Sequence, residues 1–294
     1  MKQNIFKSNL IKVVSVILIF AYSSCAFVER KAIDIIAPAL PDAIENIMAF
    51  ESAKIATKGL PGLALLISAL IGFSPENPTL LAVASEAYTA YGLLLEWDDP
   101  KLAIQAYKLG KDYGLRALKC NNSDIREGLE ENKHMYDIAN KIEKDDIPAA
   151  FWYALSYGLG IMLQMDDPEK LMGLADVTSI VDRIMELDHT YFYYTPHLFK
   201  GAYAVIAGPL MGGGVDKAIK EFEIAFKGTG NRMLLAHVFY ARYFATGIVD
   251  EQLYDKTLNY ILETPNDVLP EGRLINSIAK IKANWLLKNK GEFF

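Results

Sequence analysis

Histidines and carboxylates that stand close together are the first candidates for chemistry in this chain of 294 residues. His189 and His197 flank an aromatic run, and Asp188 precedes the first histidine. Imidazole and carboxylate groups bind zinc, but two ligands on one helix face are four residues apart. These histidines are eight residues apart, with Pro196 between them. We therefore expect no metal site here.

Three pairs of adjacent aspartates could suggest general acid–base chemistry. They are Asp98-Asp99, Asp145-Asp146 and Asp166-Asp167. Each pair stands at a predicted helix start, where a carboxylate caps free N–H groups, so capping accounts for them. The glycine-rich stretch 212–214 lacks the Lys-Ser or Lys-Thr of a phosphate loop, and no Gly-x-Ser-x-Gly sequence occurs. We expect a turn at the glycines, no catalytic residue, no cofactor and no enzyme activity.

Residues 1–24 have the features of an export signal. Lys2, Lys7 and Lys12 precede the apolar run 13–21, which is too short for a permanent membrane helix. Ser23-Ser24-Cys25 follows, and small residues before a cysteine resemble the lipobox of bacterial lipoproteins. We predict lipidation at Cys25 and a periplasmic protein anchored to a bacterial membrane. Ordinary secretion with an incidental Cys25 is the alternative.

Composition excludes several classes of protein. Apolar residues make up 52% of the chain, which is ample for a core and rules out disorder. The net charge of −6 argues against nucleic acid as a partner. Two cysteines cannot staple a disulfide scaffold. Once Cys25 is acylated Cys120 is alone, and its place at the end of a predicted helix indicates partial burial.

Helical periodicity extends over nearly all of the chain after residue 30, and no segment alternates as a strand does. Two faces show it best: Leu80, Ala84, Ala87, Tyr91 and Leu94, and Leu274, Ile278, Ile281 and Trp285. The breaks between helices are short, often Asp-Pro or Asn-Pro, and such connections make neighbouring helices pack as antiparallel hairpins. The sequence therefore predicts an all-α fold.

A small–aromatic–small pattern recurs in these helices. It is clearest at Ala218, Phe222 and Ala225, and similar spacings occur at Ala103, Tyr107 and Gly110 and at Tyr254, Leu258 and Ile261. This pattern resembles the second helix of a tetratricopeptide unit, where small residues admit the neighbouring helix. We predict about four degenerate units in a domain over 77–294. An extra helix is expected at about 123–144, and a capping helix at about 272–289.

Residues 59–75 contain no charged side chain. A membrane span needs about 20 apolar residues, and Pro61, Gly62 and Gly72 shorten the usable helix. We expect a helix buried on all sides, within an N-terminal region of anchor and apolar helices over 25–76. A helix at the membrane interface or the lining of an apolar channel is the alternative.

Aromatic residues, among them the run Tyr191-Phe192-Tyr193-Tyr194, exceed what small–large packing requires, so some of them are expected to line a groove or to contact a partner. The candidates are Trp152, Tyr153, Tyr157, Tyr240 and Tyr243. Two polar residues in apolar helices join them. Arg242 either lies at a solvated edge or pairs with Asp255 or Glu251, and Asn276 either contacts a ligand or makes an interhelical hydrogen bond.

Four stretches carry a family resemblance. They are Ala149-Ala150-Phe151-Trp152-Tyr153-Ala154, Gly208-Pro209-Leu210-Met211-Gly212-Gly213-Gly214, Phe239-Tyr240-Ala241-Arg242-Tyr243-Phe244-Ala245 and the helix 273–287. With the lipoprotein signal, they resemble the T component (TatT) family of tetratricopeptide-repeat-associated TRAP transporters. The resemblance implies an all-α periplasmic lipoprotein scaffold with a pore or groove for an apolar or amphipathic ligand, a homotrimer, and the transporter's substrate-binding protein as partner. The alternative is a generic tetratricopeptide lipoprotein scaffold for cell-envelope assembly.

Overall fold

The computed structural model of the protein describes residues 28–50, 52–209 and 212–294. The predicted signal peptide and Cys25 lie outside the described residues. Within the described ranges the chain is helical and contains no strand, so the all-α class is confirmed.

The first half of the chain contains three consecutive long helices, with shorter ones before and after them. Residues 28–36 are helical, and the following helices are α2 (Leu40–Met48), α3 (Ala53–Ile71), α4 (Pro78–Leu95), α5 (Pro100–Asn121), α6 (Ser123–Glu130), α7 (Met135–Ile138) and α8 (Ile147–Met162). The second half comprises α9 (Pro168–Leu171), α10 (Leu174–Asp188), α11 (Tyr191–Ala207), α12 (Val215–Thr229), α13 (Leu234–Phe239), the π-helical turn η5 (Tyr240–Ala245), α14 (Glu251–Glu263) and α15 (Arg273–Lys288).

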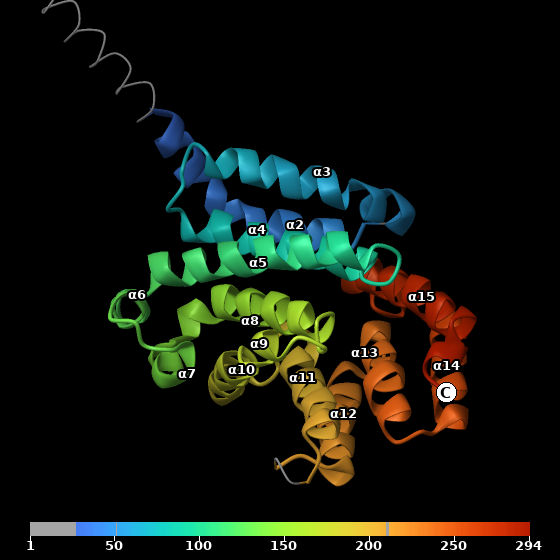
Figure 1. Ribbon diagram of the computed structural model, residues 1–294. Coiled ribbons are helices and arrows are strands. Elements are labelled where there is room, and N and C mark those ends of the chain that lie inside the picture. Colours follow the sequence, from blue (N-terminus) through green and yellow to red (C-terminus); the bar gives the residue numbers. More distant parts are fainter. Residues whose placement is uncertain (1–27, 51, 210–211) are drawn as a thin grey trace, which may run out of the picture.

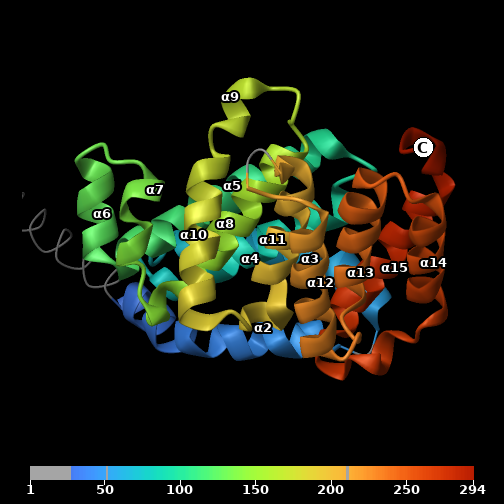
Figure 2. The same ribbon diagram turned by 90° about the horizontal axis from the view of Figure 1, so that it is seen from below.

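Consecutive helices pack against one another as hairpins, most extensively α4 with α5 and α11 with α12 (Figure 1). The last helix, α15, packs on α13 and α14 and also on α2, α3 and α4, so the end of the chain returns to its beginning. Figure 2 shows α2 along the lower edge of the view, where the upright helices α10 and α12 end. That these hairpins follow the tetratricopeptide arrangement stays a prediction.

Small residues occupy the close helix crossings. Ala218 and Ala225 are fully buried on either side of Phe222, which is 1% exposed. At the crossing of α5 and α8, a Cβ added to Gly114 would lie 2.8 Å from the backbone of Tyr153. The recurring small residues therefore let the helices approach closely, as the repeat pattern predicts.

Aspartates begin several helices. The side chain of Asp99 accepts a hydrogen bond from Leu102 N at 3.0 Å, and that of Asp167 accepts one from Glu169 N at 3.0 Å, which confirms capping at these two pairs. Asp146 differs, because it is buried and accepts hydrogen bonds from the side-chain amides of Asn121 and Asn122, 2.6 Å each. Besides its bond from Glu143 N, it therefore ties the end of α5 to the start of α8.

Two details of the predicted helices were wrong. The single helix expected at about 123–144 is divided into α6, α7 and two 3-10 turns, and Asn132 between α6 and α7 has φ of +62°, which no α-helix accommodates. The expected buried face of α15 includes Leu274 and Ile278, but Ile281 is 42% exposed. α15 otherwise has the bounds predicted for the capping helix.

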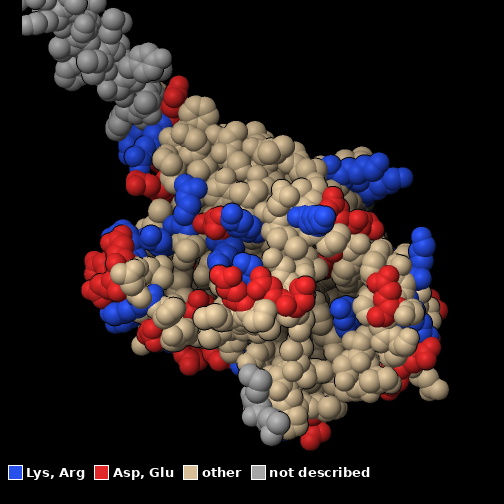
Figure 3. All heavy atoms as spheres, viewed as in Figure 1, with Lys and Arg blue, Asp and Glu red and all other residues tan. Residues whose placement is uncertain are grey.

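The uncharged segment 59–75 is not buried on all sides, contrary to expectation. α3 buries Leu60, Ala64 and Ile67, but it exposes Leu65 (66%) and Leu66 (59%). It lies along one edge of the molecule, and in Figure 3 the outer surface of this edge is mostly uncharged apart from basic atoms at the end where α3 begins. Among the described helices it is the one long and apolar enough to cross a membrane by length and composition. Cys120 also departs from expectation, since it is exposed rather than partly buried.

Candidate functional site

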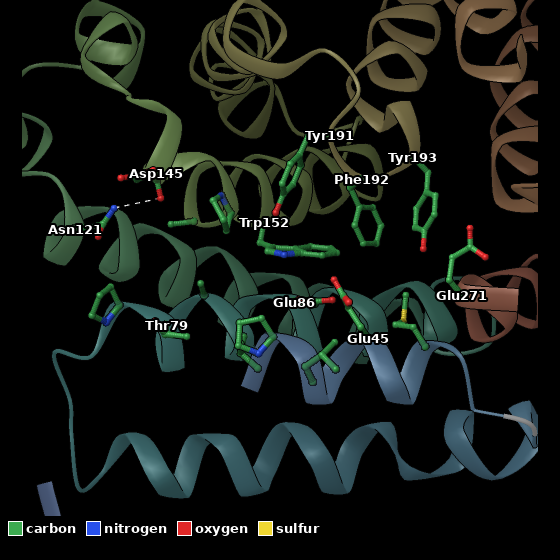
Figure 4. A pocket seen from close by; sticks show the side chains of 18 residues that line it. Glu45, Thr79, Glu86, Asn121, Asp145, Trp152, Tyr191, Phe192, Tyr193 and Glu271 are labelled. Carbon is green, nitrogen blue, oxygen red and sulfur yellow. Dashed lines mark hydrogen bonds between the residues drawn. The ribbon is translucent and has the colours of Figure 1, made fainter. Parts of the chain in front are cut away.

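A cavity of about 610 Å³ lies between α2 and α4 on one side and α8 and the start of α11 on the other (Figure 4). We call it the acidic cavity, because its lining includes Glu45, Glu86, Asp145 and Glu271. Glu45, Asp145 and Glu271 are exposed, so they stand at its rim. Glu86 stands deeper, and Figure 4 shows it close to Glu45 below the indole ring of Trp152.

Aromatic rings form the opposite wall of the acidic cavity. Trp152 comes from α8, and the three consecutive residues Tyr191, Phe192 and Tyr193 come from the start of α11. Consecutive side chains on a helix point in different directions, but Phe192 and Tyr193 have φ of +43° and +58°. This left-handed backbone, which costs about 1–2 kcal/mol per residue, lets all three rings line one cavity. The Phe192 ring packs edge-on to Trp152 with centroids 4.8 Å apart.

Glu86 is the inner carboxylate of this cavity. Its side chain is half-buried and lines both the acidic cavity and a narrower space beside it. Burial, with a smaller contribution from the negative charge of Glu45, raises the pKa of Glu86 to about 8. The same burial raises the pKa of Tyr191 and Tyr193 above the usual range.

Two further cavities follow the acidic cavity, one after the other. The first, of about 50 Å³, is the constriction, and it shares Met48, Glu86, Trp152 and Phe192 with the acidic cavity. The second, of about 540 Å³, is lined by α8 to α11 and η5. We call it the methionine-rich groove, after Met162, Met165 and Met172 in its wall.

The constriction and the methionine-rich groove also have side chains in common, namely Leu155, Thr195, Leu198 and Phe239. The three spaces therefore follow one another through the body of the protein, from a charged mouth to an apolar groove. Such an arrangement suits an elongated ligand with a polar end and an apolar chain.

The structure brings two of the predicted aromatic candidates to these cavities. Trp152 lines the acidic cavity and the constriction, and Tyr243 lines the methionine-rich groove. Tyr153 is buried in the core. The ring of Tyr157 lies outside these linings and holds the Lys111 ammonium 3.4 Å from its centroid, and Tyr240 stacks on Phe244 with centroids 4.7 Å apart.

Arg242 and Asn276 have other partners than a ligand. The carboxylates proposed for Arg242, Glu251 and Asp255, instead accept from Lys290 at 2.5 and 2.6 Å, and the guanidinium lies 4.6 Å from the ring centroid of Phe293. The ion pair proposed for Arg242 is therefore wrong. Asn276 is fully buried, and its interhelical hydrogen bonds are confirmed: it accepts from Leu234 N at 2.9 Å and donates to the carbonyls of Arg232 and Asn266.

The two histidines of the aromatic run lie together in spite of their spacing. His189 Nδ1 is 3.1 Å from His197 Nε2, and His197 Nδ1 is 2.6 Å from Glu221 Oε2. The left-handed turn at 192–194 folds the chain back between them, which helix spacing could not predict. No group of three or more metal-binding side chains occurs in the part of the chain that the structure describes.

Sequence reasoning missed the carboxylates of the acidic cavity. Glu45, Glu86 and Glu271 stand on different elements, and none belongs to a motif. Glu86 did carry a signal, because it interrupts the apolar face of α4 between Val83 and Ala90. The aromatic run at 191–194 was recognised as too dense for packing alone, and three of its four rings do line the cavity.

Comparison with known protein families gives a match to most of the chain. A family model described as TRAP transporter T-component (TAtT) matches residues 52–294, which is most of the chain. The matched region includes the cavity-lining residues of α4, α8 and α11. The match confirms the family resemblance. No curated protein sequence matches the chain.

Proposed function

Since the chain belongs to the TRAP transporter T-component family, we propose that it receives an apolar or amphipathic ligand and passes it to or from the transporter's periplasmic substrate-binding protein. One observation carries this proposal: the acidic cavity shares lining side chains with the constriction, and the constriction shares others with the methionine-rich groove. The family is one of transport accessory proteins rather than of enzymes.

The constriction controls the proposed passage. Its volume of about 50 Å³ leaves no room for a chain unless the side chains shared with its neighbours move. Phe192 stands at the end that meets the acidic cavity, and Leu155 and Phe239 stand at the end that meets the methionine-rich groove. Rotation of one such side chain joins the outer cavities, so a long alkyl chain binds only when the constriction opens.

Two matched substitutions on α4 test this passage. Ala90 lines the constriction, whereas Ala82, two helical turns earlier, lines the wide acidic cavity. Ala90→Met fills the constriction and should weaken dodecanol binding at least tenfold, because about 0.8 kcal/mol is lost for each methylene that stays in water. Hexanol binding should change little. Ala82→Met should leave the affinity for both alcohols as in the parent protein. If the two variants weaken dodecanol binding equally, the cavities do not form a passage.

Partner binding is tested by titration. The purified protein is mixed with the solute-binding protein encoded beside it, with and without that protein's ligand. A complex should form at or below tens of micromolar, roughly −6 kcal/mol or stronger. No complex in this range would leave the alternative of an envelope scaffold with another partner. Light scattering on the same sample tests the homotrimer that the family resemblance implies.

A TRAP transporter component works in the bacterial envelope, and we assign the anchor to Cys25. The exposed apolar face of α3, with Ile55, Leu65 and Leu66, supports a contact with the membrane surface close to the start of the described chain. Lys54 and Lys58 near the beginning of α3 suit anionic headgroups.

Fractionation tests the anchor and the face separately. Cys25→Ser should release the protein from membranes into the soluble periplasm, and the parent protein should carry the mass of a lipid. In the released form, Leu65→Ser with Leu66→Ser should reduce binding to vesicles that contain anionic lipid. If the double variant binds vesicles as before but changes the oligomeric state of the protein, the apolar face of α3 is a contact between copies of the chain.

A further inference from the structure

The acidic cavity has carboxyl side chains without basic ones. Of the described residues that line it, four are Asp or Glu and none is Lys, Arg or His. Charges that share a partly enclosed space of low dielectric act on a ligand more strongly than charges on an open surface. The carboxylates at the rim therefore repel a carboxylate or phosphate head group and attract a cationic one, and a cation beside Glu86 favours the ionised form of that side chain.

Glu86 has no partner in the protein. Across the described part of the chain no hydrogen bond or ion pair reaches its carboxylate, although most buried carboxylates are paired. Glu96, which directly follows the last residue of α4, shows the usual arrangement, because it binds Lys282. The raised pKa of Glu86 records the cost of ionising it without a counter-ion.

Aromatic rings surround the same point. Trp152 and Phe192 line both the acidic cavity and the constriction with Glu86, and Tyr191 and Tyr193 extend the wall toward the rim (Figure 4). Ring faces attract ammonium groups by about 0.5–2 kcal/mol, more for Trp than for Tyr or Phe. A carboxylate beside several such rings is the combination that recognises a substituted ammonium group.

Beyond Glu86 the path is apolar. The remaining side chains of the constriction are almost all aliphatic or aromatic, and Leu155, Leu198 and Phe239 continue into the methionine-rich groove. Flexible thioethers, such as those of Met162 and Met165, adapt to alkyl chains of different shape. A ligand with its polar end at Glu86 and its alkyl chain toward the groove thus matches the acidic lining at one end and the apolar lining at the other.

We propose that the ligand is an amphipath with an ammonium head group, held by Glu86 and Glu45 among the rings of Trp152 and Phe192, with its alkyl chain in the constriction and the methionine-rich groove. This inference rests on the proposed passage and adds the chemical class of the ligand. Glu86 and Trp152 bind the head group in this arrangement.

Binding of three probes with the same alkyl chain tests the head group. Dodecyltrimethylammonium, dodecanol and dodecanoate are titrated below their micellar concentrations into protein exported with Cys25→Ser, so that neither lipid anchor nor detergent competes. Trp fluorescence and calorimetry report binding. The ammonium probe should bind at least tenfold more tightly than dodecanoate, which corresponds to about 1.4 kcal/mol.

Substitution at Glu86 identifies the site. Glu86→Gln removes the carboxylate charge, so it should reduce binding of the ammonium probe about tenfold, or about 1.4 kcal/mol, and should leave dodecanol unchanged. Glu127→Gln makes the same change of charge at an exposed residue of α6 and should have no effect. Glu45→Gln, at the exposed rim, should give an intermediate loss.

Each outcome decides between the proposals. If dodecanol binds but dodecanoate binds as tightly as the ammonium probe, or if Glu86→Gln affects all three probes equally, the head-group inference is wrong and the passage stands. If none of the three probes binds, the passage itself is wrong and the head-group inference falls with it.

Discussion

The Lys282 ammonium donates a hydrogen bond to the Glu96 carboxylate, although the two residues are 186 positions apart in the sequence. Both side chains are buried, at 4% exposure each, and the ammonium lies 3.7 Å from the ring centroid of Trp97. Burial lowers the pKa of Lys282, and the charge of Glu96 opposes this shift. The pair joins the end of α4 to α15, and therefore the beginning of the chain to its end.

Breaking this pair should destabilise the fold strongly. Lys282→Met leaves Glu96 buried without a partner, and we expect a loss of about 3–5 kcal/mol in the free energy of unfolding. Chemical denaturation followed by circular dichroism measures it. Lys227→Met is the control, because the exposed Lys227–Glu223 pair contributes at most about 1 kcal/mol.

The double variant Glu96→Met with Lys282→Met distinguishes a lost pair from lost packing. Two apolar side chains of similar volume remove both charges, so most of the stability should return. A double variant as unstable as Lys282→Met alone would show that the shape of the lysine side chain, not the uncompensated charge, matters at this site.

Two glycines in helices should respond to alanine in opposite directions. A Cβ at Gly114 would lie 2.8 Å from Tyr153 Cα, so Gly114→Ala should separate α5 from α8 at a cost of roughly 1–3 kcal/mol. No atom lies within 4 Å of a Cβ at Gly62 in α3, and Gly62→Ala should stabilise the helix by roughly 0.5–1 kcal/mol. Thermal unfolding of both variants measures the signs. Two shifts of the same sign would contradict the close crossing.

The buried alanines of α12 allow a similar comparison. Ala225→Leu introduces a large side chain where the residue has no exposure, and we expect a loss of roughly 1–3 kcal/mol in the free energy of unfolding. Ala218→Leu should behave in the same way. Lys220→Leu, at an exposed position of the same helix, should change stability little. If the alanine variants unfold at the parent temperature, the small residues do not form a helix contact.

Local patterns predicted those parts of the fold that depend on local physics. The periodic faces of α4 and α12, the caps at Asp99 and Asp167 and the extent of α15 follow from side chains within a few residues of one another. The break of the expected helix at 123–144 depends on one left-handed residue, Asn132, and the pattern of apolar residues does not report it.

The cavities could be predicted only in part. Trp152 and the rings at 191–193 were identified by their density, because helices need fewer aromatic residues for packing. The left-handed backbone that turns these rings to one side is set by tertiary contacts, and so is the meeting of His189 with His197. Glu45, Glu86 and Glu271 come from α2, α4 and the segment before α15, and only the return of the chain end to its beginning brings these three together.

His237 should make the protein sensitive to acid. Its ring is 8% exposed and lies parallel to the Phe226 ring with centroids 4.3 Å apart, and its Nε2 atom has no hydrogen-bond partner among the described residues. Burial lowers the pKa of His237 from 6.5 to about 4, and a contact with the Asn231 backbone opposes this only partly. The folded protein therefore keeps this imidazole neutral at pH values where the unfolded chain protonates it.

The sign of the effect follows from proton binding. Between pH 6.5 and 4 the unfolded chain holds more protons at His237 than the folded protein does, so stability is lost as the pH falls through this window. We expect His237 to contribute roughly 2–3 kcal/mol to the loss of unfolding free energy between pH 7 and pH 4. His237→Phe should remove that part of the loss, because the ring stack is kept and no proton can bind. Denaturation curves at several pH values measure the difference between the two proteins, with His134→Phe, at an exposed histidine, as the control. Parallel pH profiles for the parent protein and His237→Phe would mean that this ring is hydrated in the folded state.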